Sequence, residues 1–381
     1  MNAKHMQEAE LQDILTSRED GEYIINIGPQ HPSTHGVLRF VVSLKGEILE
    51  YLIPHCGYIH RGIEKMCERL TYQQIIHLTD RMDYLSAHMN NEVISLAVEK
   101  GMEIEVPERA KYIRTILAEL QRLDSHQLWW SAFGMDLGGP TCFFYGLRDR
   151  EKILDIFEES FGSRLLHSYI CPGGLMNDIH PNFQTRTKEF MKYFRKKLPE
   201  YDDLLTGNVI FEQRTKGLGT LSKEEAISYG LTGPCGRGSG FSCDIRKHHP
   251  YSAYDKVEFK EILYDEGDTW ARYKVRIDEM WESMNIIEQL IDNIPAGEHT
   301  ARMKPVIKLP EGEYHQRVET ARGELVAYIV SMGDKYPYRL HFRTPNFNNL
   351  FVINRLAAGY KIADLIAISG SLDLVIPDID R

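Results

Sequence analysis

Residues 273–295, YKVRIDEMWESMNIIEQLIDNIP, contain the pattern that decides the fold class. After Tyr273, apolar residues recur at positions 277, 280, 284, 287, 291 and 294, in alternating steps of four and three. This period places them along one face of an α-helix, and Pro295 ends the run. Because such a face packs against another helix, the stretch predicts one member of a helical bundle.

A second helical block lies upstream, from about Gly62 to Gly162. After Pro107, which the first turn of a helix tolerates, apolar residues follow at positions 113, 116, 117, 120 and 123. Between the two blocks, Ser222 and Glu225 have the spacing of a capping box and predict a short helix. The centre of the chain is therefore expected to be a bundle of helices.

One helix of the upstream block is expected over Leu78–Leu96. On a helical wheel its core face consists of Leu78, Met82, Leu85, Met89 and Leu96. A second stripe, about 100° away, is polar and contains His77, Arg81, Tyr84, His88 and Asn91. This stripe has two interpretations: the edge of a core, where amphipathic side chains keep their polar ends wet, or the polar wall of a cavity that accepts an amphipathic ligand.

Strand patterns flank the bundle on both sides. Alternation over residues 23–53, with a turn at Lys45-Gly46, predicts a small sheet, and residues 322–344 predict two more strands joined at Gly333-Asp334. The expected fold class is α+β, with a small N-terminal β-sheet domain, a central helical bundle and a mixed α/β C-terminal part. The expected boundaries are a flexible segment at 1–21, the β domain at 22–61, the helical core at 62–310 and the C-terminal β-hairpin and α/β part at 311–381.

Composition excludes several classes of protein. The 381 residues include 45 basic and 55 acidic side chains, so a net charge of −10 gives no reason to expect nucleic-acid binding. No apolar stretch approaches the roughly 20 residues of a membrane-spanning helix, and the first residues resemble neither a secretory signal nor a transit peptide. The 6 cysteines form no Cys-x-x-Cys pair, so any redox centre is expected to belong to a partner.

The loop at residues 28–36, GPQHPSTHG, can hold side chains in place without a helix, since its prolines restrict the backbone. It contains His31 and His35, and His55 and His60 follow. The proline and glycine that follow the first two argue against a helix that would aim both at one metal, and the motif HExxH is absent. His31 and His55 are interpreted as hydrogen-bonded structural residues, and a metal-dependent hydrolase using all four histidines is a distant alternative.

Longer strings resemble the quinone-site subunit (the D subunit, of the 49 kDa type) of the proton-pumping NADH:quinone oxidoreductase, respiratory complex I. The resemblance runs from about residue 22 to the last residue. The strings are GPQHPSTHGVLR at 28–39, PHCGYIHRGIEK at 54–65, TDRMDYLSAH at 79–88, SLAVEK at 95–100, MDLGGPTCFFY at 135–145, YICPGGL at 169–175, CGRGSG at 235–240 and the closing PDIDR.

This family is similar in fold to the large subunit of nickel–iron hydrogenases. In the hydrogenases a Cys-x-x-Cys pair occupies the positions that here are Asp83 and Ser86, and the hydrogenase C-terminal cysteine pair is missing. A nickel ion would have no thiolate ligands, so we expect this chain to bind no metal.

The resemblance implies site residues. The family's quinone-headgroup ligands fall on His35 and Tyr84, and the carboxylate partner of the histidine falls on Asp136. An imidazole and a phenol can each hydrogen-bond a quinone carbonyl and then deliver a proton. Arg61 and Arg81 match arginines beside the terminal [4Fe-4S] cluster of a neighbouring subunit.

Two positions depart from the family pattern. A histidine that the family commonly places near the cluster is Leu166 here, with His167 one residue later, and an arginine of the family's YIRPGG string is Cys171. If the segment is helical, His167 points elsewhere. We therefore expect weak pH dependence and a comparatively low potential of the cluster, which would suit menaquinone, although the sequence does not distinguish it from ubiquinone.

The resemblance implies a quinone-binding catalytic subunit in the peripheral arm of complex I, where quinone reduction by electrons from NADH is coupled to proton translocation. The expected partners are the terminal-cluster subunit, the C subunit and the membrane subunit that forms the quinone channel. NAD, FMN and the [4Fe-4S] clusters are expected in partner subunits, and the chain is expected on the cytoplasmic side of the membrane as a peripheral protein. The alternative is a non-catalytic scaffold subunit of a related membrane-bound hydrogenase-like complex.

Overall fold

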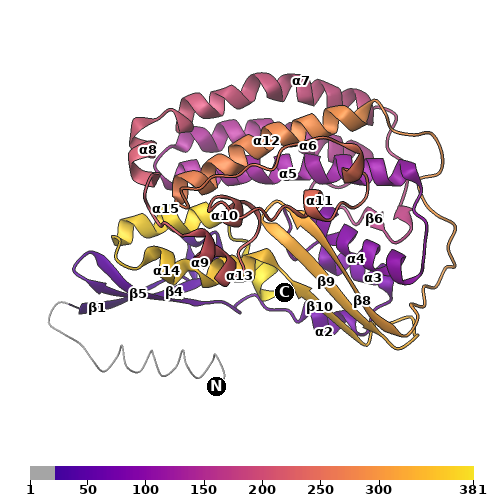
Figure 1. Cartoon of the computed structure of the whole chain (residues 1–381), viewed down its shortest axis with the longest axis horizontal. Helices are drawn as coiled ribbons and strands as arrows, with labels where there is room; N and C mark the ends of the chain where they lie inside the picture. The colour runs from indigo at the N-terminus through magenta and orange to yellow at the C-terminus, as the bar shows by residue number, and fades with distance from the viewer. Residues whose placement is uncertain (1–21) are drawn as a thin grey trace.

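The computed structural model describes residues 22–381 and has a mixed α/β architecture with small sheets. Long helices form one layer, and two separate sheets with short helices between them lie along its side (Figure 1). The long helices are α5 (Glu108–Asp136), α6 (Pro140–Phe161), α7 (Phe183–Tyr201) and α12 (Thr269–Ile291). Both helix patterns that the sequence predicts are thus confirmed, as is the capping box of α9 (Lys223–Ser228).

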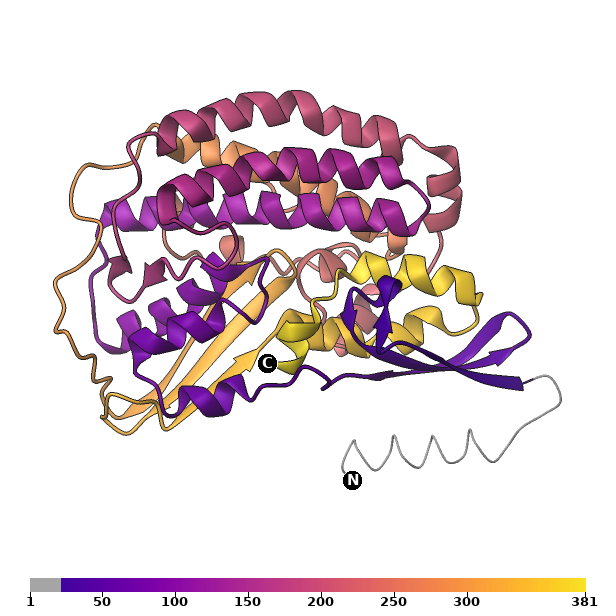
Figure 2. The same cartoon turned by 180° about the vertical axis from the view of Figure 1, so that it is seen from behind.

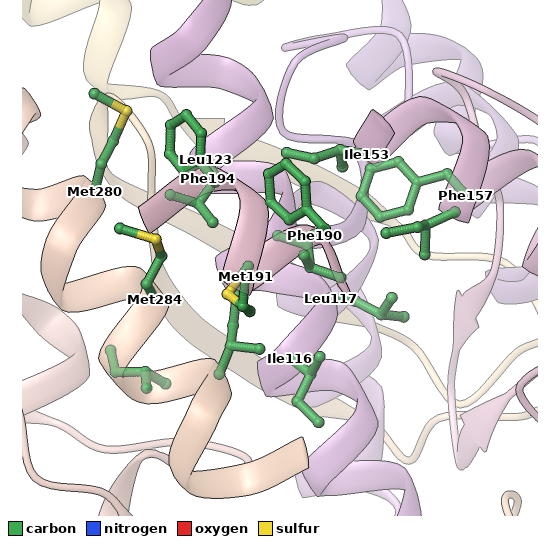
Figure 3. Packing of buried hydrophobic residues seen from close by; sticks show 14 of the residues in the cluster. Ile116, Leu117, Leu123, Ile153, Phe157, Phe190, Met191, Phe194, Met280 and Met284 are labelled. Carbon is green, nitrogen blue, oxygen red and sulfur yellow. The ribbon is translucent and has the colours of Figure 1, made fainter. Parts of the chain in front are cut away.

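The bundle is held together by a large apolar cluster. Ile116, Leu117 and Leu123 of α5 are fully buried and pack with α6, α7 and α12. Figure 3 shows Phe190 and Phe194 of α7 inserted among side chains of the other helices. Removing this apolar surface from water is the main favourable contribution to the fold.

The N-terminal sheet has the strand order β1-β4-β5, all antiparallel. Its strands are β1 (Glu22–Ile27), β4 (Arg39–Lys45) and β5 (Ile48–His55), which confirms the predicted strands. Between β1 and β4 lies the loop with β2 (Gln30–His31), the 3-10 turn η1 (Pro32–Thr34) and β3 (Gly36–Val37). This sheet shares a second apolar cluster with the C-terminal helices α13 (Pro345–Phe351), α14 (Ile353–Ala357), α15 (Ile362–Leu372) and α16 (Ile376–Asp380).

The C-terminal sheet has the order β10-β9-β8, with β8 (Gly312–Thr320), β9 (Gly323–Ser331) and β10 (Arg339–Arg343). The sequence predicts β9 and β10, whereas β8 is an additional strand. Its polar sequence, GEYHQRVET, gives little apolar alternation, and the strand is defined by its pairing with β9 along its whole length. Glu319 faces Glu324 across the tight turn at Ala321-Arg322.

The single helix expected over Leu78–Leu96 is wrong. α3 (Tyr72–Thr79) ends before Asp80, and α4 (Ala87–Gly101) begins seven residues later. Side chains compete for the backbone here, because Asp83 accepts a hydrogen bond from the amide of Leu85 and Asn90 donates to the carbonyls of Thr79 and Asp83.

This break divides the predicted polar stripe. His77, Arg81 and Tyr84 are exposed, whereas His88 and Asn91 are buried. The stripe is therefore not one wall of a cavity.

The remaining helices and strands are short. They are α2 (Ile63–Cys67), β6 (Ile170–Cys171), β7 (Gly174–Leu175), the π-helical turn η2 (Asp202–Thr206), α8 (Val209–Thr215), α10 (Gly233–Arg237), α11 (Ile245–His248) and the 3-10 turn η3 (Tyr254–Lys256). Among residues 22–381, every helix is too short or too polar to span a bilayer. The expected flexible segment at 1–21 lies outside the described residues, and the other domain boundaries stay predictions.

Candidate functional site

His35 follows η1 and is held in a rarely used backbone conformation. Its φ is 51°, in the left-handed region that costs a non-glycine residue free energy. The surroundings enforce it: the Thr34 hydroxyl lies 2.8 Å and 2.9 Å from the carbonyl oxygens of His31 and Gly36. A Cβ at Gly36 would lie 2.6 Å from Ile376, so the chain leaves the loop at a position that needs glycine.

The His35 ring reaches Asp136, the last residue of α5. Nε2 lies 2.5 Å from the Asp136 Oδ2, and the side chains are 22% and 8% exposed. Burial lowers the pKa of His35, but the hydrogen bond to Asp136 and the charges of Asp136 and Asp373 outweigh it, so the pKa is raised above its usual value. The structure thus brings together two of the predicted site residues, and this imidazole can carry a proton near neutral pH.

Tyr84 lies in the turn between α3 and α4 and is 37% exposed. Burial raises the pKa of its hydroxyl, the charge of Arg322 opposes that rise, and the charges of Asp83 and Asp373 add to it. The phenol therefore keeps its proton at neutral pH and can donate a hydrogen bond. Arg322 and Asp373 also act on His35, so His35 and Tyr84 share the same buried charges.

Sequence reasoning did not select Arg322 or Asp373. Arg322 occupies the turn between β8 and β9, where an arginine in a polar turn gives no signal of burial. Its guanidinium is nevertheless buried and bonded to both Asp83 and Asp373. The latter residue follows α15 and has a φ of 55°.

Arg61 and Arg81 are both exposed. Arg61 lies in a loop that is bonded to the C-terminal residues. The Asp380 carboxylate accepts hydrogen bonds from the backbone amides of Gly57 and Ile59, at 2.6 Å and 3.0 Å. Arg81 follows Asp80, whose buried carboxylate accepts hydrogen bonds from both the backbone amide and the hydroxyl of Ser168. Within the described part of the chain neither guanidinium makes a hydrogen bond, so both are available to a partner.

His167 lies in the interior, and the segment around it is not helical, so the condition attached to its expected direction is not met. Its ring stacks on that of His88, with centroids 4.3 Å apart and planes 11° apart. Phe157, Phe161 and Tyr169 surround the two rings. Burial lowers the pKa of His167 to about 4, against a smaller opposing effect from the backbone of Ser163, and burial also lowers that of His88. We call these two residues the His88–His167 pair.

The N-terminal histidines do not assemble a metal site. His60 hydrogen-bonds the carbonyl of Asp380, and His35 is paired with Asp136. In the part of the chain that the structure describes, no three histidine, cysteine or acidic side chains converge as a metal would need. The metal-dependent hydrolase therefore has no ligand set among these residues.

Comparison with known proteins gives the family. The model of "Respiratory-chain NADH dehydrogenase, 49 Kd subunit" matches residues 136–307 and 298–381. The D subunit of NADH-quinone oxidoreductase from Desulfotalea psychrophila is 49% identical over 363 residues, which cover 95% of this chain and 98% of that protein. The D subunit from Desulforamulus reducens is 47% identical over 359 residues, 94% of this chain and 98% of that protein.

The chain belongs to the family of the 49 kDa subunit of respiratory-chain NADH dehydrogenase. A fused relative, the C/D subunit of NADH-quinone oxidoreductase from Bacteroides thetaiotaomicron, is 59% identical over 360 residues, or 94% of this chain and 68% of that protein. The resemblance inferred from sequence strings is therefore confirmed. The relatives' names place this 49 kDa subunit family in an oxidoreductase complex.

Proposed function

We propose that this chain forms the headgroup site of quinone reduction in the peripheral arm of complex I. The observation that carries the proposal is the His35–Asp136 hydrogen bond, together with the buried charges of Arg322 and Asp373 that act on both His35 and the exposed Tyr84. A quinone becomes a quinol by taking two electrons and two protons, so its site needs hydrogen-bond donors that can also release protons.

His35 and Tyr84 would be those donors. The raised pKa of His35 lets its ring hold a proton to higher pH than an ordinary histidine, and the ring can donate to a carbonyl oxygen as negative charge develops there. Asp136 orients the ring, is its counter-ion while the ring is protonated, and favours the return of a proton after the first has left. The phenol of Tyr84 would donate to the second oxygen, and solvent would restore both protons.

The electrons would come from a [4Fe-4S] cluster held by a neighbouring subunit, which supplies one electron at a time. The family resemblance points to Arg61 and Arg81, and both are exposed cations without an internal partner among residues 22–381. Cations beside a cluster favour its reduced, more negative state. We propose that NAD and FMN also belong to other subunits, and that the hydrogenase-like fold has lost its metal function.

The proposed partners are the terminal-cluster subunit, the C subunit and the membrane subunit of the quinone channel. The chain would then lie on the cytoplasmic side of the membrane as a peripheral subunit. Relatives named as a fused C/D subunit and as a D subunit support membership in such an assembly.

Replacing Tyr84 by phenylalanine in the assembled complex tests the headgroup assignment. Only the hydroxyl of a 37% exposed residue is lost, so assembly should persist while quinone turnover falls by about 10²-fold or more. NADH oxidation by an artificial acceptor at the flavin should continue. Tyr338→Phe, at another exposed tyrosine, is the matched control and should change nothing. Near-normal quinone turnover in assembled Tyr84→Phe would refute the assignment.

A further inference from the structure

A buried guanidinium connects the chain segments that carry the proposed site. Arg322 is 1% exposed. Its Nη1 donates to Asp83 Oδ2 at 3.0 Å and to Ser125 Oγ at 3.0 Å. Its Nη2 donates to Asp373 Oδ1 at 2.9 Å, and its Nε donates to the Asp373 carbonyl at 3.0 Å. Every nitrogen of the guanidinium is used. We call these four residues the Arg322 cluster.

Each partner in the Arg322 cluster belongs to a different part of the site. Asp83 directly precedes Tyr84 in the turn between α3 and α4. Ser125 lies on α5, the helix that ends at Asp136. Asp373 follows α15 and acts electrostatically on both His35 and Tyr84. One side chain thus fixes the tyrosine turn relative to the histidine–aspartate pair.

Carboxylates outnumber cations around this guanidinium. Asp83 and Asp373 accept from it, and the buried carboxyl of Asp378 lies near enough to Asp83 that burial and that charge raise its pKa to about 7. Arg276 adds a more distant cation, with its Nε 3.9 Å from Asp373. The groups that act on His35 are Asp136, Asp373 and Arg322, and those that act on Tyr84 are Arg322, Asp83, Asp373 and Arg150.

We propose that Arg322, together with Asp373, is a positioning element of the quinone site that holds the Tyr84 turn against α5 and places a pair of opposite charges that act on His35. This inference rests on the proposed function. Arg322 acts through other groups, because its guanidinium is buried and its donors are already bonded. Its charge opposes protonation of His35, whereas the charge of Asp373 favours it.

The two charges therefore predict shifts of opposite sign. With His35 as the acid, activity falls as pH rises through the pKa of His35, so this pKa sets the basic limb of the pH–rate profile. Arg322→Gln removes a cation and should move the basic limb to higher pH. Asp373→Asn removes an anion and should move the limb to lower pH. Each shift should be on the order of one pH unit, the scale on which a nearby charge usually moves a pKa.

The experiment measures kcat and KM for quinone against pH in the assembled complex. We expect Arg322→Gln to lower kcat by roughly 10–100-fold, because a misplaced donor weakens transition-state contacts more than binding. Arg322→Lys keeps the charge and should restore the position of the basic limb while recovering only part of kcat. Asp373→Asn should shift the basic limb in the opposite direction, to lower pH. If neither Arg322 variant assembles, this shift alone tests the inference.

Arg237→Gln is the matched control. Arg237 is equally buried and bonded to two carboxylates, but in a separate network with Glu279 and Glu319. Arg237→Gln should lose about as much stability as Arg322→Gln, while the basic limb of its pH–rate profile stays where it is in the wild type. Superimposable pH profiles of the wild type, Arg322→Gln and Asp373→Asn would overturn the inference, as would a limb shift of the same sign in both variants. If Tyr84→Phe is severely impaired while these variants behave as wild type, the proposed function stands and only this inference fails.

Discussion

Two histidine environments in this molecule differ in nearly every respect. His35 is partly exposed, paired with a carboxylate, and has a raised pKa. The His88–His167 pair is buried among aromatic rings and has lowered pKa values. In this molecule, therefore, an adjacent anion raises the pKa of a histidine, whereas burial without an anion lowers it.

The first prediction removes the anion beside His35 and has the largest expected effect. Asp136→Asn removes the anion that raises the pKa of His35, so the ring should lose its proton at lower pH. We expect quinone turnover at neutral pH to fall by about 10²–10³-fold, in the range found for loss of acid–base assistance. The measurement is the steady-state rate of the assembled complex between pH 5.5 and 8.5.

Asp178→Asn is the control for this prediction, because Asp178 also pairs with a cation, Arg109, but at an exposed position. It should retain full activity. Retention of most activity in Asp136→Asn, with the basic limb unmoved, would contradict the assigned role of the carboxylate.

The second prediction tests the buried His88–His167 pair. Because the folded pKa of His167 is about 4 and an unfolded histidine titrates near ~6.5, the unfolded chain binds more protons between these values. Stability from this residue is fully present above pH ~6.5 and is lost as pH falls toward 4. The variant His167→Phe keeps an aromatic ring but cannot titrate. Between pH 7 and pH 5 its free energy of unfolding should therefore fall by about 2 kcal/mol less than that of the wild type.

Denaturant unfolding of the purified chain at both pH values measures this difference. His249→Phe, at an exposed histidine, should lose stability in parallel with the wild type. Parallel loss in His167→Phe as well would mean that His167 is already charged in the folded state.

The third prediction is the smallest and concerns the partner's cluster. Since the low pKa keeps His167 neutral between pH 6 and 8, it cannot take up a proton when the cluster is reduced. The midpoint potential should therefore vary by much less than the ~59 mV per pH unit of a one-proton, one-electron couple. Leu166→His should introduce a slope. A full slope in the wild type would instead indicate another imidazole, such as exposed His77, whose Nδ1 lies 2.9 Å from Ser168 Oγ.

Periodicity predicted the elements whose own residues determine them. The seam of α12 consists of buried residues at helical spacing, and the apolar run of β4 is buried over five consecutive residues, so the sequence shows both directly. The break after α3 was not visible, because Met82, Leu85 and Met89 continue the apolar period through it. The break depends on two side-chain hydrogen bonds: the Asn90 amide donates to the Asp83 carbonyl, and the Asp83 carboxylate accepts from the backbone amide of Leu85.

The site was predictable only in part. The positions of His35, Tyr84 and Asp136 came from the family strings, and the structure adds that His35 and Asp136 meet across 101 positions. Arg322 escaped notice because burial of a turn residue is decided by what packs over it. Asp83 and Asp373 lie far away in the sequence, and no local pattern joins them to Arg322.

The sheet formed by β1, β4 and β5 has a consequence for biosynthesis. The last helices of the chain lie over this sheet (Figure 2) and share its apolar cluster. The Leu52 amide donates to Asn354, 302 positions later. At a synthesis rate of about 5–20 residues per second, the ribosome needs roughly 15–60 s to deliver that cover. Throughout this interval Phe40, Val42 and Leu52 present an uncovered surface, so the nascent chain is a natural client for chaperones that bind apolar strands.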